Sequence, residues 1–262
     1  MNIFLYDNTF EGLLTVIFDS YFQKIIPDKI IKPNEQQGIM WSKTHESITD
    51  ESKAERVWNG LHKKLSADTC QALHKAYLSE LQDVELLIFH IAKKAFESEY
   101  CIEKNFADEH ILQLSQIHRK VVRETQRILM FLRFQKTADD IYFAVFEPKY
   151  NVLPLTLNHF ESRFSDQKWV VYDGLRNYGF FYDLKTVEHV VLHNSKIDLK
   201  TGNMNDSILH SKEKLFQELW QEYYATLCIT ERKNPKLHKQ MLPMRFWKFL
   251  PEKNKIKNYS RR

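Results

Sequence analysis

Apolar and polar positions in the first half of the chain predict a short strand followed by helices. The apolar run "NIFLY" at residues 2–6 is typical of a strand, and Asn8 or Thr9 can cap the helix that follows, "FEGLLTVIFDSYF". The polar segment from Pro27 to Asp50 is expected to be a connection with one short strand. Beyond it, apolar residues recur at the 3.6-residue period of a helix. This period predicts helices over 52–65, 67–81, 84–96 and about 107–132.

From Asp140 onward the pattern changes to short runs of aromatic and β-branched residues. "IYFAVFEP" alternates as a strand does, and "LPLTLNHFESRF" returns to helical spacing with Pro154 in its first turn. "KWVVYD" and "YGFFYD" flank the turn signal "GLRN", which predicts a β-hairpin, and "VEHVVLH" adds another strand. A last helix, "SKEKLFQELWQEYYATLCI", leads into a proline-containing segment.

These elements predict an α+β protein. We expect a mainly helical part with an N-terminal strand over residues 1–105. An α+β part over 106–262 would carry a small mixed or antiparallel sheet, flanking helices and a basic C-terminal segment. A lone strand would leave its backbone groups unpaired, so we expect "NIFLY" to join the sheet built from residues 140–193 and make one compact body.

Positive charge is concentrated in two blocks. Residues 229–262 carry eleven Lys and Arg against two Glu, a net charge of +9, whereas the rest of the chain has 27 cations against 32 acids. Residues 118–136 carry six cations and one Glu. Such an uneven charge favours a polyanionic partner, and a solvated tail is the alternative.

Three arginines recur every four residues along the predicted helix 107–132. Arg119, Arg123 and Arg127 would repel one another at this spacing by a few tenths of a kcal/mol each. Local pairing with Glu124 is one way to compensate the repulsion, and binding of phosphate is the other.

Sequence motifs for common catalytic sites are absent. The chain has no phosphate-binding glycine loop, no G-x-S-x-G and no H-E-x-x-H, and its three cysteines are scattered, so we expect no metal and no cofactor. His189 and His193 would share a strand face but lack a carboxylate cluster.

No apolar run is long enough to span a membrane and no signal peptide is evident, so we expect a cytoplasmic protein without a membrane partner.

Three strings carry a resemblance to a known family: "HRKVVRETQRILMFLRF", "YFAVFEPKYNVLPLTLNHFESRFSDQKWVVYDGLRNYGFFYD" and "ERKNPKLHKQMLPMRFWKFLPE". The opening "FLYDNTFEGLLTVIFDSYF" is also similar to the start of that family. The chain resembles a bacterial family of unknown function described as DNA-metabolism or DNA-repair proteins. In that family related chains are encoded beside a radical-SAM protein, and some are fused to a uracil-DNA glycosylase; this chain is similar to the stand-alone form.

The resemblance implies which residues bear on function. It extends over Arg123, Glu124, Arg127, Arg133, Phe134, His159, Phe160, Arg163, Phe164, Asp173, Tyr178, Asn234, Pro235, Lys236, Gln240, Pro243, Arg245, Trp247 and Lys248. Where the family usually reads "MPKRYWK", this chain reads "LPMRFWK", so it has neither a charge at Met244 nor a phenol at Phe246.

Three functional hypotheses follow. The first is a DNA-binding protein of a repair or base-modification pathway that acts on DNA, including single-stranded or damaged DNA, with a radical-SAM partner. Its nucleic-acid contacts would be Arg119, Arg123, Arg127, Arg133, Arg163, Lys236, Arg245, Trp247 and Lys248. Trp247 would offer a stacking surface, unless it packs in the core.

The second hypothesis is a hydrolase of nucleic acid or damaged nucleotides. Its acid/base groups would be Glu147, His159 and Asp173. A structural role of Asp173 in its turn is the alternative. The third hypothesis is a protein-interaction scaffold whose basic segment meets an acidic surface.

Overall fold

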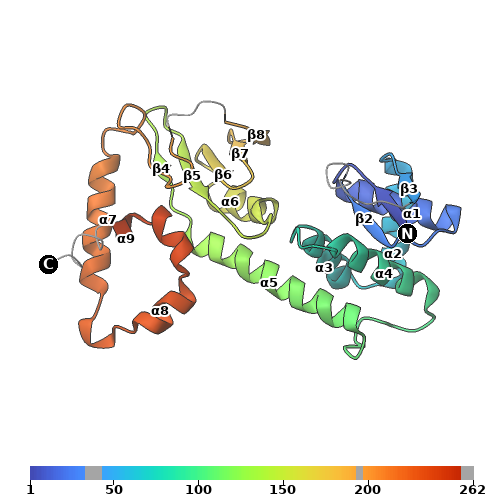
Figure 1. Ribbon diagram of the computed structural model, residues 1–262. Coiled ribbons are helices and arrows are strands. Elements are labelled where there is room, and N and C mark those ends of the chain that lie inside the picture. The colour runs from blue at the N-terminus through green and yellow to red at the C-terminus, as the bar shows by residue number, and fades with distance from the viewer. Residues whose placement is uncertain (33–42, 193–196, 255–262) are drawn as a thin grey trace. The chain divides into compact units, whose positions relative to one another are not determined.

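The structure is a computed structural model that describes residues 1–32, 43–192 and 197–254 (Figure 1). Contacts within the chain divide it into two compact units, Met1–Val122 and Arg123–Arg262, called here the N-terminal and the C-terminal unit. The boundary lies inside a long helix, α5 (Glu109–Phe131), whereas the sequence placed it before that helix, at residue 105. Half of the residues are helical and 15% lie in strands, which confirms the α+β class.

A small parallel sheet opens the N-terminal unit. Strand β1 (Asn2–Leu5) lies between β2 (Lys29–Ile31) and β3 (Lys43–Glu46), and both neighbours run parallel to it. The expectation that "NIFLY" joins the later sheet is therefore wrong. The described part of the polar connection contains two short strands instead of one, and they satisfy the backbone of β1 within the same unit.

Helices make up the rest of the N-terminal unit, and two of them begin at side-chain caps, of which Thr9 was expected. The Thr9 side chain accepts from the Gly12 amide at the start of α1, and Asp50 accepts from the Lys53 amide at the start of α2. The helices are α1 (Phe10–Gln23), α2 (Glu51–Lys64), α3 (Ala67–Tyr77) and α4 (Val84–Glu97). Their apolar faces supply fully buried side chains such as Leu13, Leu61 and Ile88.

A five-stranded mixed sheet forms the centre of the C-terminal unit. Its order is β4-β5-β6-β7-β8; the β5–β6 pair is parallel and the other pairs are antiparallel. The predicted hairpin around "GLRN" is the β6–β7 pair, so that prediction is confirmed. The strands are β4 (Gln135–Lys136), β5 (Tyr142–Phe146), β6 (Trp169–Asp173), β7 (Tyr178–Tyr182) and β8 (Val187–Val190).

One short helix connects the two parallel strands. The segment between β5 and β6 forms the 3-10 turn η2 (Leu153–Thr156) and helix α6 (Leu157–Arg163). Phe160 of α6 lies against the fully buried Trp169 of β6, with ring centroids 6.0 Å apart. Burying such aromatic side chains stabilises the unit by roughly 1.5–3 kcal/mol each.

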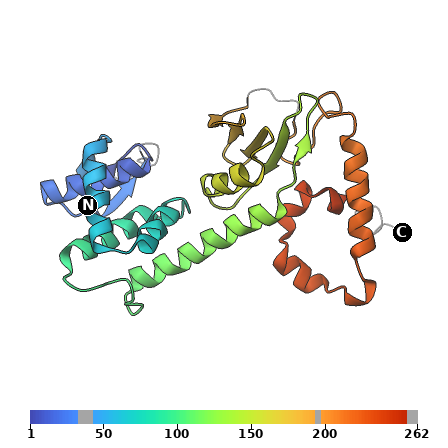
Figure 2. The same cartoon turned by 180° about the vertical axis from the view of Figure 1, so that it is seen from behind.

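The last described segment of the chain folds beside the β4 edge of this sheet, as Figures 1 and 2 show for α7. The prolines at 235, 243 and 251 interrupt it, as expected of residues that cannot continue a helix. Its elements are α7 (Glu213–Leu227), the 3-10 turn η3 (Thr230–Arg232), α8 (Pro235–Met241), the 3-10 turn η4 (Met244–Phe249) and α9 (Pro251–Asn254). In the described part of the chain, no helix combines the length and apolarity needed to cross a membrane.

Candidate functional site

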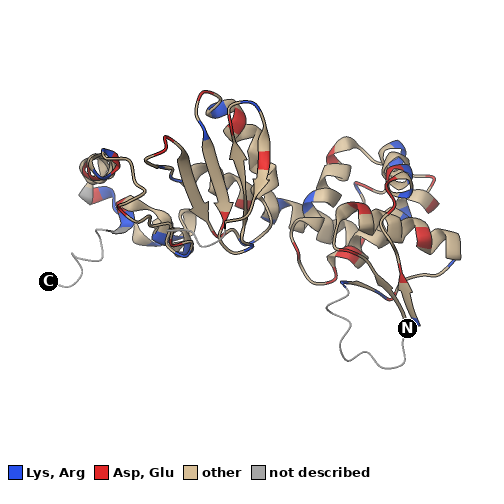
Figure 3. Cartoon of the chain, turned by 90° about the horizontal axis from the view of Figure 1, so that it is seen from above, with Lys and Arg blue, Asp and Glu red and all other residues tan. Residues whose placement is uncertain are grey.

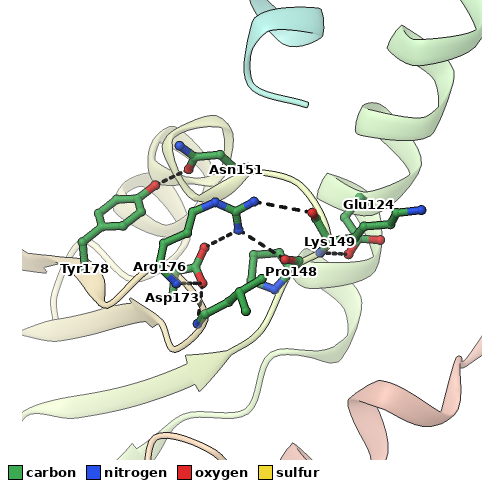
Figure 4. Close-up of polar contacts among 8 residues, drawn as sticks. Glu124, Pro148, Lys149, Asn151, Asp173, Arg176 and Tyr178 are labelled. Carbon is green, nitrogen blue, oxygen red and sulfur yellow. Dashed lines mark hydrogen bonds and ion pairs between the residues drawn. The ribbon is translucent and has the colours of Figure 1, made fainter. Parts of the chain in front are cut away.

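Polar side chains gather where β5 and β6 end. Because these strands are parallel neighbours, the residues after both strands lie at the same edge of the sheet. Asp173 is the last residue of β6, and the loop 147–151 follows β5. This arrangement brings two sequence-distant segments together in the C-terminal unit (Figure 4).

Asp173 is completely buried, and both of its carboxylate oxygens accept hydrogen bonds within its own turn. One carboxylate oxygen accepts from the amides of Leu175 and Arg176 at 2.9 and 3.1 Å, and the other accepts from the Arg176 guanidinium at 3.0 Å. Burial raises the pKa of this carboxyl, and the charge and hydrogen bonds of Arg176 act in the opposite direction. Asp173 therefore serves as the anchor of the β6–β7 turn, the structural alternative stated above.

Arg176 links this turn to the loop after β5. Its guanidinium also donates to the carbonyl oxygens of Pro148 and Lys149, at 3.2 and 3.4 Å (Figure 4). Nearby, the hydroxyl of Tyr178 donates to the side-chain oxygen of Asn151. The hairpin thus binds the loop 147–151 through two side chains, Arg176 and Tyr178.

Glu124 holds the same loop from the other side. This side chain of α5 is only 3% exposed, and it accepts from the amide of Lys149 at 2.8 Å and from the guanidinium of Arg245. Arg127 lies 3.9 Å away along the helix, so the expected local pairing is present as a long contact. A single buried carboxylate therefore joins α5, the loop after β5 and the C-terminal segment.

Two further carboxylates link the C-terminal segment, described here over residues 229–254, to the rest of the C-terminal unit. The nearly buried Glu252 accepts from the guanidinium of Arg133 and from the indole of Trp220, both at 2.9 Å. Glu147 accepts from the ammonium of Lys248 at 2.5 Å. The segment is folded onto the unit through these ion pairs and through buried apolar side chains, Phe246 and Leu250.

The three proposed acid/base residues are not brought together. Glu147 is paired with Lys248, and Asp173 is buried in its turn. His159 is exposed on α6, and its recorded contact is the edge of the Phe160 ring. No hydrogen bond joins His159 to either carboxylate among the described residues. The geometry gives the hydrolase hypothesis no support.

The proposed nucleic-acid contacts fall into two groups. Arg119, Arg123, Arg163 and Lys236 are exposed, and Arg127 is half-buried. By contrast, the structure gives Arg133, Arg245 and Lys248 carboxylate partners within the C-terminal unit.

Trp247 is half-buried. Its indole donates to the carbonyl of Leu242 at 3.0 Å, and its ring contacts the His238 ring and the ammonium of Lys253. These contacts fix its orientation within the C-terminal segment.

The exposed side of α5 is cationic. After Glu109 the only acid in this helix is Glu124, which is buried, while Arg119, Lys120 and Arg123 point outward without a recorded ion pair among the described residues. Figure 3 marks the Lys and Arg positions along the chain in blue. The repulsion between these charges is therefore not compensated on the helix surface.

Sequence reasoning missed Arg176 and Asn151, which complete the cluster. Both lie in strings that were recognised for other reasons: Arg176 in the turn signal "GLRN" and Asn151 between β5 and η2. The spacing of Asp173 and Arg176 across a hairpin turn was the available signal, because oppositely charged residues three apart meet in a tight turn.

Metal ligands do not gather in the described part of the chain, where no group of three or more His, Cys, Asp or Glu side chains could hold an ion. His189 stacks on Tyr178 with ring centroids 5.4 Å apart, and His193 lies outside the described residues. Cys70, Cys101 and Cys228 are free.

One family profile matches the chain, over residues 82–252; it is described as a domain of unknown function, DUF4130. The match includes the whole cluster around Glu124, Asp173 and Arg176, together with the C-terminal segment up to Glu252. No curated protein matches the chain. Since the profile covers well over half of the sequence, the chain belongs to the DUF4130 family.

Proposed function

We propose that this protein binds nucleic acid in a DNA-repair or base-modification pathway. The observation that carries the proposal is the solvent face of α5, where Arg119, Lys120 and Arg123 are exposed and unpaired among the described residues. Clustered cations without nearby acids attract phosphate by releasing its counterions. Bound phosphate would relieve the repulsion between these cations, so this face of α5 is well suited to bind a polyanion.

Under this proposal the cations of the C-terminal segment fall into two groups. Arg245 and Lys248 stabilise the fold through Glu124 and Glu147, so they are poorly placed to contribute most of the binding. Lys236 and Lys239 of α8 are exposed and remain available to phosphate. The main contact is thereby assigned to α5 and a secondary one to α8.

A radical-SAM protein is proposed as the partner in the pathway. The resemblance to chains encoded beside such proteins supports this. The partner would hold the cluster and perform the redox chemistry, while this chain would bind the DNA.

The salt dependence of DNA binding tests the proposal. Fluorescence anisotropy with a labelled duplex and a labelled single strand, each over a series of salt concentrations, gives the slope of log K against log salt. Changing Arg119 and Arg123 together to Ala should flatten this slope by roughly 1.8 units on duplex DNA, since each phosphate contact contributes about 0.9. Sequence preference should change little.

The matched control removes two exposed cations elsewhere, Lys168→Ala with Lys185→Ala, which lowers the net charge equally. It should leave the slope within about half a unit of wild type. Equal flattening in both double variants would mean that binding follows net charge and not the α5 face. Undetectable binding of DNA and RNA at low salt by the wild-type protein would reject nucleic-acid binding itself.

A further inference from the structure

Helix α7 presents large apolar side chains to solvent. Five of them lie on one stripe of the helix, each between 38% and 59% exposed; we call this set the α7 stripe. Its members are Leu215, Phe216, Leu219, Trp220 and Tyr223. They are spaced at i, i+1, i+4, i+5 and i+8, so they form a continuous surface.

The opposite side of α7 is polar and faces the rest of the C-terminal unit, and Trp220, at the edge of the stripe, also contacts this unit through Glu252. Glu213 is buried and accepts from the Lys136 amide at 3.1 Å, and Gln221 donates to the Pro251 carbonyl at 3.0 Å. An amphipathic helix of a monomer normally buries its apolar side. Because α7 does the reverse, its apolar side is suited to cover another surface.

A complementary surface lies on the segment that follows α7 in the chain. An apolar groove of about 520 Å³ runs along α8, and we call it the α8 groove. Its apolar side chains are Phe131, Leu227, Ile229, Leu237, Met241 and Leu242. Leu237 and Met241 are 51% and 64% exposed, so the groove lacks a cover in the described part of the chain.

The charges bordering the two surfaces are opposite. Glu218 and Glu222 are exposed on α7 along one border of the stripe, whereas Arg232 and Lys233 line the groove. Lys236 and Lys239 add two exposed cations from α8, and none of the four has a recorded ion pair among the described residues. An acidic apolar helix fits a basic apolar groove, because charge complementarity sets the register of such contacts.

We propose that two copies of this chain pair through these surfaces, with the α7 stripe of each copy lying in the α8 groove of the other. A symmetric pair buries both surfaces twice, since a two-fold contact requires one chain to carry both complementary halves. Within one copy, α7 is fixed by the polar contacts of its inner side, so its stripe cannot turn into its own groove. This pairing forms without nucleic acid, and it competes with the secondary phosphate contact because both use Lys236 and Lys239 of α8.

Sedimentation velocity over a range of protein concentrations, without nucleic acid, tests the pairing. Wild type should sediment as a dimer. Leu219→Glu should weaken the dimer at least about tenfold, because it places a charge at the centre of an apolar contact. Leu219 is exposed and Glu is a good helix former, so circular dichroism and the melting temperature should stay near wild type.

The matched control is Leu112→Glu, which makes the same change at an exposed leucine of helix α5. It should leave the dimer intact. Equal loss of dimer in both variants would indicate a general effect of added charge and would overturn the proposal.

Charge reversal identifies the two surfaces as partners of each other. One variant carries Glu218→Lys with Glu222→Lys, and the other carries Lys236→Glu with Lys239→Glu. Alone, each should dimerise at least about tenfold more weakly than wild type, because like charges then meet at both contacts. An equimolar mixture should restore the dimer, since reversed α7 meets reversed α8 and native α7 meets native α8.

Three results would overturn the proposal. The first is a wild-type protein that stays monomeric at about 100 µM, a concentration at which even weak specific dimers form. The second is a dimer that survives Leu219→Glu. The third is a mixture of the charge-reversed variants that remains monomeric although wild type dimerises. The first result would leave the apolar surface to another protein or to another part of the chain.

Discussion

Replacing Arg176 by Ala should destabilise the sheet edge that holds the candidate cluster. The guanidinium is 15% exposed and faces the fully buried Asp173 at 3.0 Å. It also donates to two carbonyl oxygens of the loop 147–151. The substitution leaves a carboxylate in the interior without its counter-charge, and it releases the loop from the hairpin.

The expected cost is about 3–5 kcal/mol, which is typical of removing one partner from a buried ion pair. The amides of Leu175 and Arg176 still donate to Asp173 in the variant, so we expect the lower half of this range. Since 1.4 kcal/mol changes an equilibrium tenfold, amides protected by this region should exchange with solvent roughly 100-fold to 1000-fold faster.

Hydrogen exchange followed by mass spectrometry measures this effect locally, which matters in a chain of two units. Peptides from β5 to β7 should lose protection at pH 7.5, whereas peptides from the N-terminal unit should not. The control is Lys214→Ala, which breaks an ion pair with Asp206 on the surface, both side chains being more than 60% exposed. Its effect should be at most about 1 kcal/mol.

The same variant should show a defined pH dependence. Burial raises the pKa of Asp173 above the ordinary value of 3.8, so ionising this group opposes folding. Its contribution to stability is complete below the unfolded pKa and is lost as pH rises through the folded pKa. Without Arg176 the pKa of Asp173 in the folded state rises further. The loss of stability of Arg176→Ala relative to wild type should therefore be smaller at pH 5 than at pH 7.5, once the exchange rates are corrected for the intrinsic exchange rate at each pH. Exchange within threefold of wild type at pH 7.5 would refute the reasoning.

Three further predictions concern other parts of the chain. Glu252→Ala should reduce protection of α7 by roughly 2–4 kcal/mol, since Arg133 and the Trp220 indole lose their acceptor, whereas Lys248→Ala, at a more exposed pair, should cost less than about 1 kcal/mol by the same measurement. Gly12→Ala should lower the melting temperature of the N-terminal unit, because a Cβ there would lie 2.2 Å from a carboxylate oxygen of Asp7; an unchanged melting temperature would count against this close approach. Burial lowers the pKa of His74, so its share of stability is present above the ordinary pKa of 6.5 and is lost as pH falls through the lowered value, and a titration by NMR that gives a pKa above 6.5 would contradict this.

The local elements followed from the sequence, because their signals are local. Helix α5 was expected over 107–132 and spans Glu109–Phe131, and the apolar positions Ile111, Leu114 and Ile117 are buried as its period implied. The hairpin around "GLRN" was predicted for the same reason, since a turn and its two flanking strands are contiguous. The caps at Thr9 and Asp50 depend on side chains within three residues of the helix start.

The pairing of distant elements was decided only by the tertiary structure. The run "NIFLY" identified a strand but not its neighbours, because β2 and β3 are three and four residues long and β3, "KTHE", is polar. Strand pairing depends on which backbone edges meet after packing, and short polar strands leave almost no trace in the pattern.

The charges show the same division between sequence and structure. The sequence determined that the C-terminal segment and α5 are rich in cations. From the sequence alone, Arg245, Lys248, Arg119 and Arg123 were equivalent candidates for nucleic-acid contacts. The tertiary structure separated them: Arg245 meets Glu124 across 121 residues of chain, while Arg119 and Arg123 have no recorded ion pair among the described residues. Whether a cation is paired depends on the carboxylates that folding brings within about 4 Å, and this distance is set by packing and not by the order of residues along the chain.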